Sequence, residues 1–184
     1  MHFYVICYCK LEPLIYMGHL DFMNLWQLVM RRANVPIAYS EGYNPQMKLN
    51  FVQPLSLGMT GKNECLHIAL KEDCDAIDIY NKIKETLPEG LKLFKVVKTK
   101  FNAKWFNKHK SSIVYKIECN KKITSKELSF IQENQFCLKC YLAEKQIIFI
   151  ELLNTNQKQV KIKDILLSSF DVSKISRMGV RFKI

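Results

Sequence analysis

The sequence predicts an α+β protein made of two units of similar size, each with an antiparallel sheet. Short apolar runs of strand length alternate with stretches of helix length, and this order occurs twice along the 184 residues. The charge also changes near the middle, because residues 1–100 contain 12 Lys/Arg and 10 Asp/Glu, whereas residues 101–184 contain 16 and 7. We therefore expect one unit over residues 1–100 and a more basic unit over 101–184.

The first half has the order strand, helix, strand, strand, helix, strand. Strands are expected at residues 2–9, 48–53, 65–71 and 91–98, and helices at 19–34 and 75–87. The sequence Pro88-Glu89-Gly90 is a stop signal for the second helix. The lysine-rich stretch 99–110 that follows is expected to be a connector.

The second half has the same order. Strands are expected at residues 112–119, 136–142, 146–153 and 174–184, and helices at 124–135 and 160–169. Thr124 and Ser125 precede Glu127, which is a capping pattern. Two βαββαβ units in tandem are the ferredoxin-like plan, so this is the expected fold, although the halves share no sequence repeat.

A polar cluster flanks the apolar helix predicted over residues 19–34. Its members are His19, Asp21, Arg31, Arg32, Tyr39, Ser40, Glu41, Asn44 and Lys48. Asp21 near the helix start and the two arginines near its end also suit the helix dipole, which explains part of their placement without function. We expect the cluster to converge on one surface, which requires the loop that contains Asn44 to run back along the helix.

Two interpretations of this cluster remain open. The loop over residues 39–48 is rich in hydroxyl and amide groups, so it either binds a phosphate or a base edge or serves as a hydrogen-bonded connector. His19 is either a helix cap or a group that exchanges a proton near pH 7, with Tyr39 as its partner. His19 and Tyr39 are the candidate catalytic residues.

The second half begins beside a basic segment that contains aromatic residues. Its candidate nucleic-acid contacts are Lys98, Lys100, Lys104, Trp105, Lys108 and Lys110. Lysines that hold phosphates and rings that stack on bases are typical of single-stranded RNA binding. The alternative is a solvated linker whose aromatic rings, including Phe101 and Phe106, belong to the core.

The seven cysteines predict no metal site and no cofactor. A radical SAM cluster needs the spacing C-x3-C-x2-C, which does not occur. Cys137 and Cys140 form a single C-x-x-C, and we expect them to face opposite sides of a strand. Cys7 and Cys9 share a strand face but make only half a site. Without a signal peptide or an eighteen-residue apolar stretch, we expect reduced thiols in a cytoplasmic protein that does not bind membranes.

Two long motifs resemble a known family. The first is Gly18-His19-Leu20-Asp21, and the second runs from Arg31-Arg32-Ala33 through Pro36 and Tyr39-Ser40-Glu41-Gly42-Tyr43-Asn44-Pro45 to Lys48. Together with Pro54-Leu55-Ser56-Leu57-Gly58, they resemble the radical-SAM-associated domain, which occurs in B12-binding radical SAM proteins or as a separate bacterial protein. The departures from the family pattern are mild: Gly18 for Ser, Tyr43 for Phe and Met47 for Pro.

The resemblance covers residues 1–100 well and the second half only in outline. Because the chain lacks a radical SAM core, the resemblance implies a non-catalytic accessory protein that works with a separate radical SAM enzyme and binds or presents an RNA, such as tRNA or rRNA. Two alternatives stay open: a protein-interaction scaffold for that enzyme, and a metal-independent endoribonuclease that uses His19.

Overall fold

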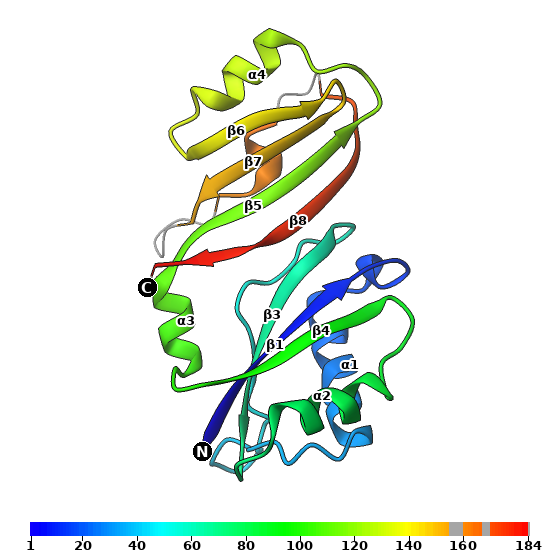
Figure 1. Cartoon of the computed structure of the whole chain (residues 1–184), viewed down its shortest axis with the longest axis vertical. Helices are drawn as coiled ribbons and strands as arrows, with labels where there is room; N and C mark the ends of the chain where they lie inside the picture. The colour runs from blue at the N-terminus through cyan, green and yellow to red at the C-terminus, as the bar shows by residue number, and fades with distance from the viewer. Residues whose placement is uncertain (155–159, 167–169, 184) are drawn as a thin grey trace. The chain divides into compact units, whose positions relative to one another are not determined.

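The computed structural model describes residues 1–154, 160–166 and 170–183, and it divides the chain into two compact units. The first unit is Met1–Asn107 and the second is Lys108–Ile184. Each unit contains helices and an antiparallel sheet, so the mixed α+β class is confirmed (Figure 1). The first unit holds 13 Lys/Arg and 10 Asp/Glu and the second holds 15 and 7, so the excess positive charge belongs mainly to the second unit.

The first unit follows the predicted element order. Its elements are β1 (His2–Lys10), η1 (Leu14–Tyr16), α1 (His19–Arg32), β2 (Leu49–Phe51), β3 (Thr60–Leu70), α2 (Ala76–Lys84) and β4 (Leu91–Thr99). The strands are antiparallel neighbours in the order β4-β1-β3-β2.

The core of the first unit lies between one sheet face and the two helices. Alternate residues of β1 point to this face, beginning with Tyr4 and Ile6, and they pack with Trp26 and Met30 of α1 and Ile83 of α2. Trp26 and Met30 are fully buried, as expected for a helix that is apolar on most of its surface. Because the middle of α1 is anchored in the core, the positions of its two polar ends at the surface are determined by this packing.

The second unit has the same strand order. Its elements are β5 (Lys110–Cys119), α4 (Ser125–Gln132), β6 (Cys137–Glu144), β7 (Ile147–Leu153), η2 (Ile162–Asp164) and β8 (Val172–Phe182), with the strands ordered β8-β5-β7-β6. Thr124 and Glu127 form the expected capping box at the start of α4. Cross-strand pairs such as Ile117 with Ile148 are fully buried, so this sheet has its own apolar face.

Two expectations about these elements differ from the structure. The stretch expected to be a connector contains a helix, α3 (Ala103–His109). The helix expected at 160–169 is only the short 3₁₀ turn η2 among the described residues, and its last three positions lie outside them. In the described part of the chain, no helix is long and apolar enough to cross a membrane.

Candidate functional site

The end of α1 and the segment after it form a shallow depression of about 320 Å³. Arg31 is in the last turn of α1, and the chain then turns through Asn34, which has a φ of 49°. Asn34, Tyr39 and Lys71 line the depression together with Arg31. Arg31 and Lys71 are exposed, and Tyr39 is 39 % exposed. The depression therefore combines two cations, an amide and an aromatic ring.

Backbone contacts hold the sides of this depression in place. The amide of Lys71 donates to the carbonyl of Pro36 at 2.9 Å, and the amide of Ala38 donates to the carbonyl of Ala69 at 2.8 Å. The ammonium of Lys71 lies 5.7 Å from the centre of the Tyr39 ring, within the range of a cation–π contact. The segment after α1 is thus fixed to the end of β3, and this fixes Tyr39 beside Lys71.

The motif loop beyond Tyr39 is a closed hairpin. Tyr39 pairs with Met47, the amide of Ser40 donates to the carbonyl of Gln46 at 2.8 Å, and the Ser40 hydroxyl accepts from the amide of Gln46 at 2.9 Å. Gly42 has a φ of 118°, which favours glycine at the tip. Glu41, Tyr43 and Asn44 are exposed at this tip, and Tyr43 is fully exposed. The loop therefore presents an aromatic ring and polar groups close to the depression.

The structure does not bring all of the predicted residues to one surface. His19 and Asp21 open α1, so about 20 Å of helix separates His19 from Arg31 and Arg32 at a rise of about 1.5 Å per residue. The His19 ring packs edge-on against Phe51 of β2 at 5.4 Å, whereas Tyr39 lies beside the end of β3. His19 and Tyr39 therefore do not form an acid–base pair, and the polar cluster is split between the two ends of α1.

Other details refine the predicted roles. The N-cap of α1 is Gly18, and no side chain caps the helix, so His19 is not the cap that the sequence allowed. The ammonium of Lys48 lies 3.4 Å from the sulfur of Met1, and the amide of Lys48 donates to the carbonyl of Ala38. Lys71 and Asn34 were not predicted as site residues. Lys71 follows a strand about thirty residues beyond Tyr39, and no local pattern links the two residues.

The basic segment is more ordered than a solvated linker, and its rings are engaged. Trp105 stacks on Phe101 with ring centres 3.9 Å apart, and Phe106 packs against the buried His67 at 5.5 Å. The His67 ring nitrogen Nε2 is 3.0 Å from the carbonyl of Phe101. The three aromatic rings are half-buried rather than free platforms for bases.

The lysines of this segment differ in their surroundings. Lys98 pairs with Asp73 at 2.5 Å, and the ammonium of Lys100 lies 5.5 Å from the centre of the Phe101 ring. Lys104 and Lys108 are exposed. Burial, together with the nearby Arg177, lowers the pKa of the half-buried Lys110. Lys104 is thus an exposed member of the predicted phosphate contacts, whereas Lys98 already has an acidic partner.

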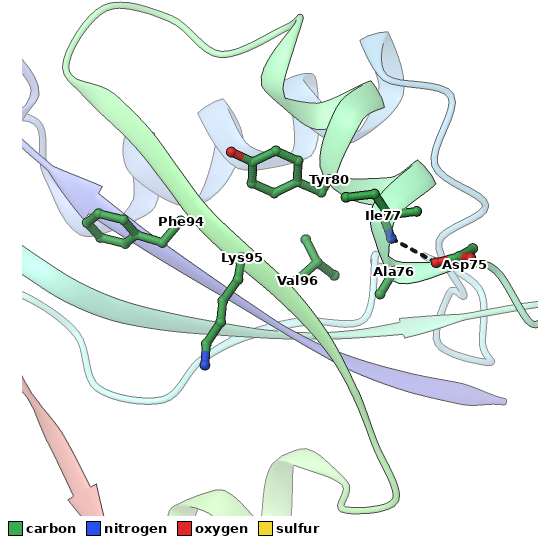
Figure 2. A pocket seen from close by; sticks show the side chains of 7 residues that line it. All are labelled: Asp75, Ala76, Ile77, Tyr80, Phe94, Lys95 and Val96. Carbon is green, nitrogen blue, oxygen red and sulfur yellow. Dashed lines mark hydrogen bonds between the residues drawn. The ribbon is translucent and has the colours of Figure 1, made fainter.

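A second depression, of about 370 Å³, lies between α2 and β4 (Figure 2). Ile77 is 57 % exposed and Phe94 is 52 % exposed. Phe94 is the extra residue of a β-bulge, because Tyr8 pairs with Leu93 and Cys7 pairs with Lys95. Figure 2 shows Tyr80 on the helix side of β4 and the Lys95 side chain directed away from Ile77. Exposed apolar side chains therefore form part of the lining of this depression.

The two cysteines of the C-x-x-C are closer than the alternation of a strand predicts. A β-bulge between Cys137 and Lys139 shifts the register of β6, so the expectation of opposite faces was wrong. Burial raises the pKa of Cys140 to about 12, with the Cys137 thiol as the further cause. The pair is therefore held as neutral thiols at neutral pH.

Residues 4–181 match a protein family described as "Uncharacterized protein conserved in bacteria (DUF2344)". The chain belongs to this family. The match spans both units. No curated protein matches the chain. The family description names no partner and no reaction, so the relation to radical SAM proteins rests on the motif resemblance.

Proposed function

We propose that this protein is a non-catalytic accessory protein that binds RNA and works with a separate radical SAM enzyme. The observation that carries the RNA-binding part is the depression at the end of α1, which Arg31, Tyr39 and Lys71 line together, with the Lys71 ammonium near the Tyr39 ring. Cations hold phosphates and exposed rings stack on bases, and the fully exposed Tyr43 supplies a second ring at the tip of the adjoining loop. The net charge of +11 favours a polyanionic partner.

A fold of two tandem ferredoxin-like units is part of the proposal. What supports it is the strand order, which is β4-β1-β3-β2 in the first unit and β8-β5-β7-β6 in the second. In each unit the first and third strands are therefore central and the second and fourth are at the edges, as a split βαβ plan requires. In the second unit, η2 stands in the position of the second helix.

The RNA-binding part is tested by the salt dependence of binding. The full chain is titrated into a fluorescein-labelled single-stranded RNA of mixed sequence, and anisotropy is read at several KCl concentrations. Each phosphate contact contributes roughly 0.7 to the slope of log affinity against log salt. We expect the double variant Arg31→Gln/Lys71→Gln to lower the slope by about 1.4, which is two contacts at that value.

Matched variants separate the depression from general charge. Lys62→Gln and Lys84→Gln remove two exposed lysines of the same unit that lie outside the depression, so we expect this control to bind like the wild type. Tyr43→Ala removes a ring without changing charge, so it should weaken binding at every salt concentration and leave the slope unchanged. If Arg31→Gln/Lys71→Gln and the lysine control lower the salt slope equally, the depression is rejected as the RNA-binding site.

A protein-interaction scaffold is the second candidate, and the depression between α2 and β4 favours it. Its support is the pair of half-exposed apolar side chains, Ile77 and Phe94, beside a strand at the edge of the sheet. Size-exclusion chromatography of the chain with a radical SAM enzyme from the same genome tests it. We expect a complex that Phe94→Ser disrupts and that Phe130→Ser, at another exposed ring, leaves intact. If no complex forms, the proposed radical SAM partner is rejected, whereas the proposal of RNA binding is unaffected.

A further inference from the structure

Cys7 and Cys65 face each other across the two central strands of the first unit. They are register partners in the antiparallel pair of β1 and β3, so their side chains lie on the same face of the sheet. This face is opposite to the helices, because Ile6 and Tyr8, the chain neighbours of Cys7, belong to the core on the helix side. Cys7 is buried and Cys65 is half-buried.

The backbone shows which kind of pair they form. The carbonyl of Cys65 accepts from the amide of Val52, which lies just after β2. In an antiparallel ladder the N–H and C=O of one residue point the same way, so those of Cys65 point toward the β2 side and away from β1. Cys7 and Cys65 are therefore a non-hydrogen-bonded pair, in which Cα atoms are about 4.5 Å apart. That separation is within the range of about 4.4–6.8 Å found for disulfides.

The surroundings of Cys7 favour the thiolate. Lys95 of β4 is the register partner of Cys7 on its other side, so Cys65, Cys7 and Lys95 form a row across three strands. A hydrogen bond from Cys65 lowers the pKa of Cys7 to about 7, burial opposes this shift, and the charge of Lys95 adds to it.

Cys9, two residues further along β1, is held differently. Its thiol donates to the carbonyl of Lys62 at 2.9 Å, and burial raises its pKa. Of the two cysteines in β1, only Cys7 therefore combines a thiol neighbour with a nearby cation. Cys9 serves as a matched control from the same strand.

We propose that Cys7 and Cys65 are a redox-active dithiol that a low-molecular-weight disulfide, such as oxidised glutathione, converts to a cross-strand disulfide. Cys65, the more exposed of the two, loses its thiol proton to solvent and attacks one glutathione sulfur, which releases the first glutathione thiolate. The Cys7 thiolate then attacks the Cys65 sulfur and releases the second. Two protein thiols are oxidised, one glutathione disulfide is reduced to two thiols, and the two thiol protons pass to the glutathione thiolates or to solvent.

The test is oxidation of the full folded chain followed by mass spectrometry. The wild type and the variant Cys9→Ser are incubated with oxidised glutathione at pH 7, remaining thiols are blocked with N-ethylmaleimide, and the chain is digested with trypsin. We expect both proteins to yield a peptide containing residues 1–10 linked to the peptide that contains Cys65, with a loss of two protein thiols. Cys7→Ser and Cys65→Ser should not yield it.

A variant of Lys95 tests whether the lysine beside Cys7 contributes to the reaction. Lys95→Gln removes one of the causes that lower the pKa of Cys7, so the attack of Cys7 on the Cys65 sulfur should slow and the linked peptide should accumulate more slowly than in the wild type. Lys92→Gln removes the lysine that faces Cys9 instead, and its rate should match the wild type. A link through Cys9, a persistent glutathione adduct on Cys65, or no reaction in folded wild-type protein would each overturn the proposal.

Discussion

Gly90 is the position where a single methyl group tests the packing of the first unit most sharply. It precedes β4, and its carbonyl accepts from the amide of Leu11 at 2.8 Å. Its φ is +86°, and a Cβ at this position would lie 2.9 Å from Leu14 Cγ and 3.1 Å from the carbonyl oxygens of Leu11 and Glu12. Two of these three atoms are backbone, so they cannot rotate away from an added methyl group.

The expected cost of Gly90→Ala has two parts. A left-handed backbone costs a residue with a Cβ roughly 1–2 kcal/mol, and reduced freedom of the unfolded chain offsets about 0.4–1 kcal/mol of this. Overpacking adds about 1–3 kcal/mol. We therefore expect Gly90→Ala to lower the free energy of unfolding by about 2–4 kcal/mol. Gly58→Ala is the matched control, because Gly58 has a φ of +75° and nothing within 4 Å of its added Cβ. It should lose only about 1 kcal/mol.

Urea unfolding followed by tryptophan fluorescence measures this difference. Both tryptophans, Trp26 and Trp105, belong to the first unit, so their emission reports on that unit alone. At a slope of about 1.5 kcal/mol per molar urea, a loss of 3 kcal/mol lowers the unfolding midpoint by about 2 M. Equal losses in the two variants would refute the close approach of Gly90 to Leu11 and Glu12.

Two further predictions concern the buried histidine and the helix cap. Burial lowers the pKa of His67 below its ordinary value of 6.5, although the Phe101 carbonyl partly opposes this, and Nδ1 has no partner for a second proton among the residues that the structure describes. Its contribution to stability is therefore complete above pH 6.5 and is lost as the pH falls from 6.5 toward the lower folded value, by at most about 1.4 kcal/mol per pH unit. Urea titrations at pH 7 and pH 5 should show a smaller decline for His67→Gln than for the wild type, and equal declines would contradict the assignment. Thr124→Ala should cost the second unit about 1 kcal/mol in urea titrations followed by far-ultraviolet circular dichroism, whereas the exposed Ser129→Ala on the same helix should cost less. Equal losses would show that the cap does not contribute.

The sequence predicted most elements of the first unit because their signals are local. The apolar surface of α1 and the stop signal at Pro88-Glu89-Gly90 each involve neighbouring residues, and the helices that they predict are present. The helix α3 was missed because lysines at 100, 104 and 108 suggested a solvated connector, whereas the Phe106 ring of this short helix packs on His67. The conformation of this segment is therefore determined by the packing of its aromatic residues rather than by its charge.

The candidate site was predicted in part. The motif indicated Arg31 and Tyr39, and both line the depression. Lys71 joins them only because the chain after α1 pairs with the end of β3. That pairing joins residues far apart in the sequence, so a local pattern could not predict it. The neighbouring thiols of Cys137 and Cys140 were missed for a related reason. The β-bulge that places them on one face of β6 depends on the pairing with β7, and the sequence of β6 alone does not predict it.

Photo-crosslinking tests the central claim, that RNA binds at the end of α1, most directly. A single-stranded RNA containing 4-thiouridine is bound to the full chain at low salt and irradiated, and the cross-linked peptides are identified after trypsin digestion. Cleavage after Arg32 and Lys48 releases residues 33–48 as one peptide that contains both Tyr39 and Tyr43. We predict that this peptide carries the main crosslink and that Arg31→Gln/Lys71→Gln reduces it, whereas crosslinks confined to residues 101–183, or none at all, would contradict the account.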